Sequence, residues 1–174
     1  MSSTMDPSTQ LRMELKDSAG RSMRADSGHL APILTHLNAD TTWLCQLPIP
    51  QSARHPGGRQ YYSILIDPWL AGPQVDVGRW FSEQWHATRS KVESIAEVEE
   101  LIRGRTEAVD AIDAGHERRA RRPTRGSQTE MDPEEERSPI DVVVVSYEFA
   151  DHCHKQTLLE VDRDVPIFAT KVCG

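Results

Sequence analysis

Two short runs of mostly apolar residues stand out in the hydrophobic pattern of this chain. The first is YYSILID at Tyr61–Asp67, and the second is IDVVVV at Ile140–Val145, where Asp141 is the one polar break. β-Branched runs of this kind, without alternation, are typical of strands that are buried on both faces. We therefore predict a strand in each range, and Pro68 stops the first of them.

Shorter patterns predict further elements between these two strands. Ile33–Leu47 has the pattern of two short strands about a turn at 38–40. Ser90–Arg105 carries apolar residues at helical spacing and is predicted as a helix. Ser94-x-x-Glu97 resembles a capping box partway along that helix.

The chain after the valine run predicts two more elements. His154–Asp162 begins a short helix, and Val165–Lys171 is predicted as a second buried strand. Strands, a helix, a strand, a helix and a strand in this order are typical of an α/β fold. An exposed sheet edge after Val165–Ala169 predicts self-association of the chain through that edge.

The remaining segments have no sustained period. Residues 1–30 are polar and are predicted to be flexible, so that the ordered domain spans 31–174. The range 115–139 is nearly free of apolar residues, basic first and acidic last, and is predicted as a disordered insertion. The range 69–86 is irregular but contains three tryptophans and a phenylalanine, so we expect it to fold over the core or a pocket edge.

Composition narrows the class of protein. The net charge of −7 argues against nucleic acid or an anionic membrane as the main partner. No apolar run approaches the roughly 20 residues that span a bilayer, and the amino terminus lacks the apolar core of a signal peptide. Three widely spaced cysteines indicate no disulfide framework. We therefore expect a cytoplasmic protein.

Four adjacent residues that could bind a metal or carry a proton lie in the loop after the valine run: Asp151, His152, Cys153 and His154. Carboxylate and imidazole groups suit a divalent metal such as zinc, although adjacent residues cannot all converge on one ion. An Asp beside a His also suits a proton carrier. The third interpretation is structural: Asp151 caps the following helix and the two histidines form local hydrogen bonds.

Asp67 ends the first strand and has two interpretations. An Asp before a proline favours a turn. It also lies at the carboxyl end of a predicted strand, where open α/β folds place their ligands. If the strands run parallel, Asp67 shares one cleft with the residues that follow Val145.

These residues resemble the metallo-β-lactamase-fold hydrolases. ILIDPWL in the first strand and S-Y-E-F-A-D-H-C-H at Ser146–His154 are similar to the fungal-type members, whose motif reads S-H-E-F-T-D-H-C-H. The resemblance covers about Ile33–Thr170. It implies about the first half of an αββα sandwich, with the later metal ligands of the family absent from this chain.

The resemblance assigns roles residue by residue. Asp151 and His152 match ligands of the second metal, and Asp67 matches a strand-end Asp close to the metals. Tyr147 and Phe149 stand where two histidine ligands belong in the family, so the metal motif is degenerate. His154 is an extra imidazole that we include among the metal candidates. The implied catalytic residues are Asp67 and Asp151.

The expected function follows from that match. The parent reaction is metal-assisted hydrolysis of a small-molecule substrate. We expect this chain to hold one zinc ion or none, and its hydrolytic activity to be impaired or absent. The alternative is a non-catalytic interaction protein or a vestigial protein of the same fold.

Overall fold

The fold was analysed in a computed structural model, which describes residues 6, 9–11, 13–14, 30–55, 58–75, 78–120 and 137–170, with only the backbone described over 109–120. The elements, in chain order, are β1 (Ile33–His36), β2 (Trp43–Pro48), the 3-10 turn η1 (Gln51–Ala53), β3 (Tyr61–Ile66), β4 (Gln74–Val75), β5 (Glu83–Gln84), α2 (Ile95–Ala120), β6 (Val142–Val145), α3 (Lys155–Leu158) and β7 (Ile167–Ala169). No described helix is both long enough and apolar enough to cross a membrane.

Five strands form one mixed sheet in the order β1-β2-β3-β6-β7. The first three strands are antiparallel neighbours, whereas β6 runs parallel to both β3 and β7. The predicted α/β class is therefore confirmed. The two strands predicted in Ile33–Leu47 and the strands predicted at Tyr61–Asp67 and Ile140–Val145 are also confirmed. The carboxyl ends of β3 and β6 lie at the same end of the sheet, because Ile66 pairs with Val144.

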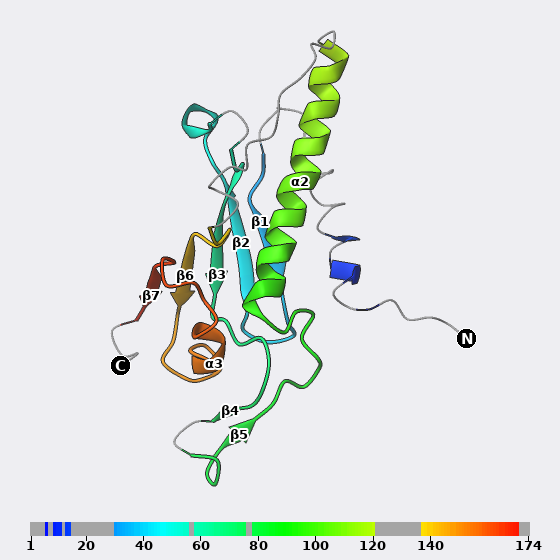
Figure 1. Cartoon of the computed structure of the whole chain (residues 1–174). Helices are drawn as coiled ribbons and strands as arrows, with labels where there is room; N and C mark the ends of the chain where they lie inside the picture. The colour runs from blue at the N-terminus through cyan, green and yellow to red at the C-terminus, as the bar shows by residue number, and fades with distance from the viewer. Residues whose placement is uncertain are drawn as a thin grey trace, which may run out of the picture.

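One face of the sheet packs against α2 (Figure 1). The inner strands of the sheet contribute alternate residues, such as Leu44, Leu65 and Val143, all fully buried. The helix contributes Ile95, Val98, Leu101 and Ile102 at helical spacing. This layer of aliphatic side chains is the hydrophobic core, and it fixes the strand ends that carry the site.

Helix α2 begins later and ends later than the sequence predicted. The Ser94 hydroxyl accepts a hydrogen bond from the Glu97 amide at 3.2 Å, and the Glu97 carboxylate accepts from the Glu93 amide at 2.7 Å. This capping box starts the helix rather than lying within it. The helix then continues to Ala120, so the prediction of disorder is wrong for residues 115–120. Residues 121–136 of that predicted insertion lie outside the described residues.

Two predictions of buried aromatic and apolar residues are only partly right. In the range 69–86, Trp69 is buried, but Trp80 and Trp85 are 85% and 64% exposed around the small β4–β5 hairpin. Strand β7 was predicted to be buried, yet all three of its residues are exposed. The reason is its place at the end of the described sheet, where only β6 is its neighbour.

Candidate functional site

The candidate site lies where β3 and β6 end. Asp67 directly follows β3, and Ser146 directly follows β6. The parallel register of these strands brings the two residues together although 79 positions separate them. The loop 147–154 then returns His152 to the same strand ends. The sequence predicted this juxtaposition of Asp67 with the residues after Val145, and the structure confirms it.

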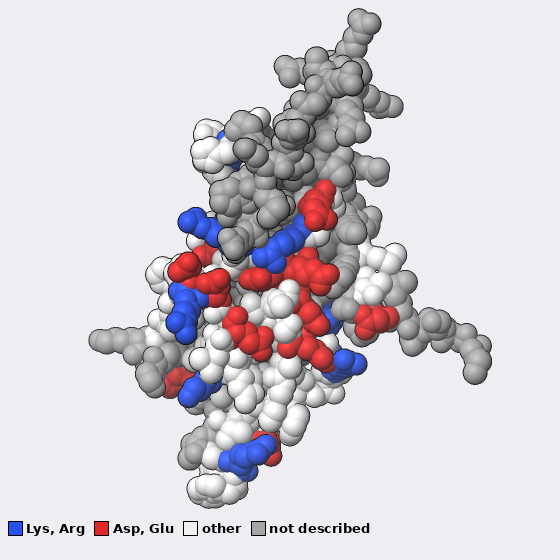
Figure 2. All heavy atoms as spheres, in the orientation of Figure 1, with Lys and Arg blue, Asp and Glu red and all other residues white. Residues whose placement is uncertain are grey.

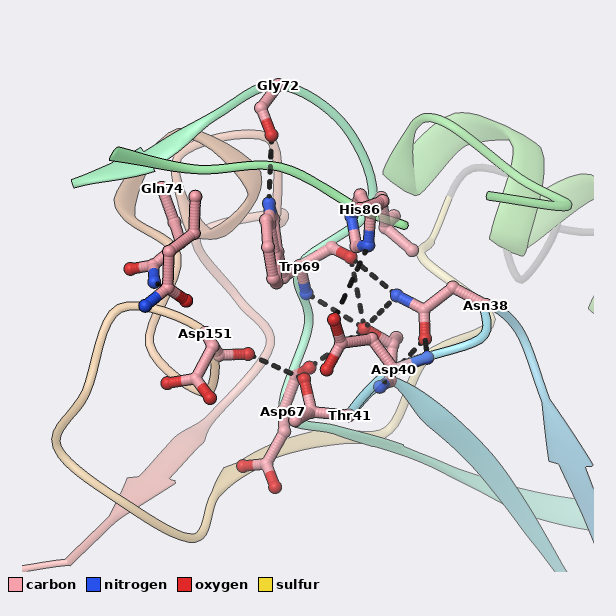
Figure 3. Close-up of polar contacts among 12 residues, drawn as sticks. Asn38, Asp40, Thr41, Asp67, Trp69, Gly72, Gln74, His86 and Asp151 are labelled. Carbon is pink, nitrogen blue, oxygen red and sulfur yellow. Dashed lines mark hydrogen bonds and ion pairs between the residues drawn. The ribbon is translucent and has the colours of Figure 1, made fainter. Parts of the chain in front are cut away.

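Asp67 has an unusual backbone conformation, with φ of +48°. Only Gly and, less readily, Asn and Asp adopt this left-handed region without large strain. A buried polar network holds the chain there: the Thr42 hydroxyl lies 2.9 Å from the Asp67 carbonyl oxygen and accepts a hydrogen bond from the Trp69 amide at 2.9 Å. The Asn38 side-chain amide donates to the Trp69 carbonyl at 2.8 Å (Figure 3). The turn after β1 and the segment after Asp67 therefore hold the strained backbone of Asp67 in place.

The Asp67 carboxylate, almost fully buried, organises the site. It accepts hydrogen bonds from the Ser146 amide and the Ser146 hydroxyl, both at 2.6 Å. It also accepts from the Nδ1 atom of His152 at 2.9 Å. Three donors therefore surround one carboxylate, and one of them is a backbone amide.

These contacts determine which nitrogen of His152 carries the proton. An ionised carboxylate can only accept, so the Nδ1 atom that faces Asp67 must be protonated. In a neutral imidazole the Nε2 atom then has a free lone pair. This atom lies 3.5 Å from an Oδ2 oxygen of Asp151. The Nε2 atom of His152 and the Oδ2 atom of Asp151 therefore face each other at the partly exposed end of the site.

Asp151 is held by its backbone. The Thr41 hydroxyl donates to the Asp151 carbonyl oxygen at 2.6 Å, which ties the loop after β6 to the turn after β1 (Figure 3). Its side chain is 29% exposed, and its carboxylate faces the Nε2 atom of His152. The Asp67 and Asp151 carboxylates thus have different surroundings, one buried among donors and the other open.

His154 is not part of this group. Its Nδ1 atom accepts from the Thr157 hydroxyl at 2.9 Å and from the Thr157 amide, so that His154 is the N-cap of α3. Its Nε2 atom donates to the Pro73 carbonyl oxygen at 3.4 Å. Burial lowers the pKa of His154 below its ordinary value. The structure therefore assigns to His154 the capping role that the structural interpretation gave to Asp151.

A second histidine, His86, is half-buried beside it. His86 stacks on Trp69 with 3.9 Å between the ring centroids. Burial lowers the pKa of His86, and the Asp40 carboxylate, 3.9 Å away, opposes this only in part. These contacts make His86 a neutral packing residue.

The metal trio predicted from the sequence is not assembled. Among the described residues, no three His, Cys, Asp or Glu side chains gather in a way that could hold an ion. Asp151 and His152 are adjacent, but His154 faces α3. Tyr147 and Phe149, which stand at the two degenerate positions, are 48% and 52% exposed and contact each other edge to face.

Sequence reasoning missed the residues that support Asp67 and Asp151. Asn38, Thr41 and Thr42 lie in a turn of unremarkable composition, and nothing in their spacing connects them to a strand end 25 residues later. The one available signal was the density of polar residues in N-A-D-T-T, which we interpreted only as a turn.

Comparisons with protein-family models, with curated proteins and with solved structures gave no match to this chain.

Proposed function

We propose that the chain is a metallo-β-lactamase-like protein that binds one divalent metal ion, with zinc as the first candidate, through Asp151 and His152. The observation that supports this most strongly is the Asp67–His152–Asp151 arrangement. A carboxylate that accepts from the Nδ1 atom of a histidine leaves Nε2 free to coordinate, and metal-binding histidines commonly have such a partner.

The spacing of the two donors fits a single ion. Two ligand atoms at about 2.1 Å from a tetrahedral zinc ion lie about 3.4 Å apart. The Nε2 atom of His152 and the Oδ2 atom of Asp151 are separated by 3.5 Å. An ion between them would also relieve the approach of a lone pair to a carboxylate oxygen.

Each residue has one role in this proposal. Asp151 and His152 hold the ion, and Asp67 orients the imidazole and fixes its tautomer. Ser146 keeps the Asp67 carboxylate in place through its amide and hydroxyl. A bound divalent ion supplies Lewis acidity and lowers the pKa of a water molecule, which is the chemistry of hydrolysis. The donor set does not fit a two-ion centre, because Phe149 has no ligand atom and only two ligands converge among the described residues.

Titration calorimetry with zinc chloride tests the proposal. We expect the unaltered chain to bind close to one zinc ion and Asp151→Asn and His152→Ala to abolish that binding. Asp67→Asn should weaken it by about 10- to 100-fold, because the imidazole loses the carboxylate that orients it. His55→Ala, a change at an exposed loop histidine, is the matched control and should bind as the unaltered chain does. Unchanged zinc binding in His152→Ala, or none in the unaltered chain, would contradict the proposal.

The second candidate is a non-catalytic protein of the same fold. The exposed aromatic pair Tyr147 and Phe149 supports it, since these residues offer contact surface where hydrolases of the family place ligands. Assays with generic ester and phosphodiester substrates in excess zinc distinguish the two candidates. Hydrolysis that is lost in Asp151→Ala supports the enzyme, whereas zinc binding without hydrolysis supports the non-catalytic protein.

A further inference from the structure

Three rings lie next to one another in the loop that carries the candidate metal ligands. The centroid of the Tyr147 ring is 5.9 Å from that of the His152 ring, with an angle of 72° between the ring planes. The Phe149 ring lies 4.9 Å from the Tyr147 ring, at 80°. All three rings belong to the loop Ser146–His154, so this arrangement is set within one short segment. Tyr147 and Phe149, the aromatic pair, therefore adjoin the imidazole of the proposed metal site.

The aromatic pair is accessible to a ligand. Tyr147 and Phe149 are 48% and 52% exposed, so about half of each side chain is open to contact. The side chains of His152 and Asp151 are also partly exposed, at 25% and 29%. A ligand that reaches these two side chains thus has an apolar surface beside it. An apolar group favours contact with such rings over contact with water.

The charges around the site disfavour a phosphoester. The loop Ser146–His154 contains Glu148 and Asp151 but no Lys or Arg, and Asp67 adds a third carboxylate. Lys155, the next residue, is exposed at the start of α3. The whole chain carries a net charge of −7, and Figure 2 shows acidic side chains gathered on the face on which α2 lies. Phosphate groups are usually held by Arg or Lys, so these surroundings favour an uncharged ligand.

We propose that the site takes a small uncharged ester or amide with an apolar acyl group, and that the acyl group lies against Tyr147 and Phe149. The inference deepens the proposed function. It rests on zinc binding through Asp151 and His152, and it holds for a chain that hydrolyses its ligand and for one that only binds it. A tetrahedral zinc ion with two protein ligands has two further positions, and oxygen atoms suit them. The polar end of the ligand is then held at the ion and the apolar end at the aromatic pair.

Calorimetry of the zinc-loaded full chain with two hydroxamic acids tests the inference. Acetohydroxamic acid and benzohydroxamic acid have the same metal-binding group and are both uncharged in neutral solution. They differ only in the methyl or phenyl group on the acyl carbon. We expect the unaltered chain to bind benzohydroxamic acid about tenfold more tightly than acetohydroxamic acid, because only the phenyl group covers the aromatic pair. Zinc binding is measured first, without either acid, so that a failure of the metal site is seen separately.

Four variants locate the apolar contact. Tyr147→Ala and Phe149→Ala should each reduce the preference to about twofold or less, whereas Tyr147→Phe keeps the ring and should keep the preference. Tyr62→Ala is the matched control, because Tyr62 is a 41% exposed aromatic residue near the start of β3, at the opposite end of that strand from Asp67. It should leave the preference unchanged. All four variants should bind zinc as the unaltered chain does, since none of them removes a proposed ligand. Circular dichroism checks that each variant is folded.

Three results would overturn the inference while the metal site stands. Equal binding of the two acids by the zinc-loaded chain is the first. The second is a preference that survives in both Tyr147→Ala and Phe149→Ala, which would place the apolar contact elsewhere. The third is tighter binding of phenyl phosphate than of benzohydroxamic acid, which would assign the site to phosphoesters. An unaltered chain that binds no zinc would contradict the proposed function itself, and this inference with it.

Discussion

At the scale of single residues, the neighbouring histidines 152 and 154 have different environments. His152 faces the Asp67 carboxylate and keeps its Nε2 atom available, whereas both ring nitrogens of His154 are used inside the fold. Spacing alone could not separate them, because both are imidazoles in the same loop. The difference arises where α3 begins, since the N-cap residue must turn its side chain toward the helix amides.

The buried state of His154 predicts a dependence of stability on pH. Its pKa is lowered in the folded chain, so the unfolded chain binds more protons between the folded pKa and the unfolded value of 6.5. The contribution to stability is therefore complete above pH 6.5 and is lost as the pH falls toward the folded pKa. The half-buried His86 has a pKa shifted in the same direction and should add to the effect.

Urea unfolding between pH 7.5 and pH 5 measures this effect. We expect the free energy of unfolding of the unaltered chain to fall on acidification. His154→Asn keeps a side-chain acceptor at the N-cap but removes the titrating group, so its loss on acidification should be smaller. An identical pH dependence in the two proteins would show that His154 does not titrate as its burial requires.

At the scale of elements, the capping box of α2 was recognised in the sequence but was placed inside the helix rather than at its start. The apolar spacing of Ser90–Arg105 predicted the helix, and the capping box Ser94-x-x-Glu97 was taken as internal. In the structure the box is the start, and the Ile95 amide donates to the Glu160 carboxylate at 3.0 Å. The residues before Ser94 instead form a connection in which Val92 packs in the core.

A pair of serine variants tests this helix start. Ser94→Ala removes the cap and should lower the free energy of unfolding by about 1 kcal/mol. Ser90→Ala should be neutral or slightly stabilising, because the buried Ser90 hydroxyl has no hydrogen-bond partner among the described residues. Thermal or urea unfolding of both variants gives the answer. A larger loss in Ser90→Ala than in Ser94→Ala would place the helix start at the earlier residue.

At the scale of the whole molecule, the sequence predicted what depends on continuous runs of residues. β-Branched runs identified β3 and β6, and the parallel arrangement then placed Asp67 beside the loop after Val145. Features that depend on distant segments were not predictable. The support of Asp67 by Thr42 spans 25 positions, and the exposure of Phe168 depends on which strands pair with β7.

The central claim is that Asp67 fixes His152 with its proton on Nδ1 so that Nε2 can bind a metal ion. NMR of the imidazole nitrogens in ¹⁵N-labelled protein measures this directly at neutral pH. We predict an Nδ1–H tautomer for His152, and on addition of zinc a change in the Nε2 signal while Nδ1 keeps its proton. The Asp67→Asn variant should lose the preference for this tautomer. An Nε2–H tautomer in the unaltered chain, or an Nε2 signal that zinc leaves unchanged, would contradict the account.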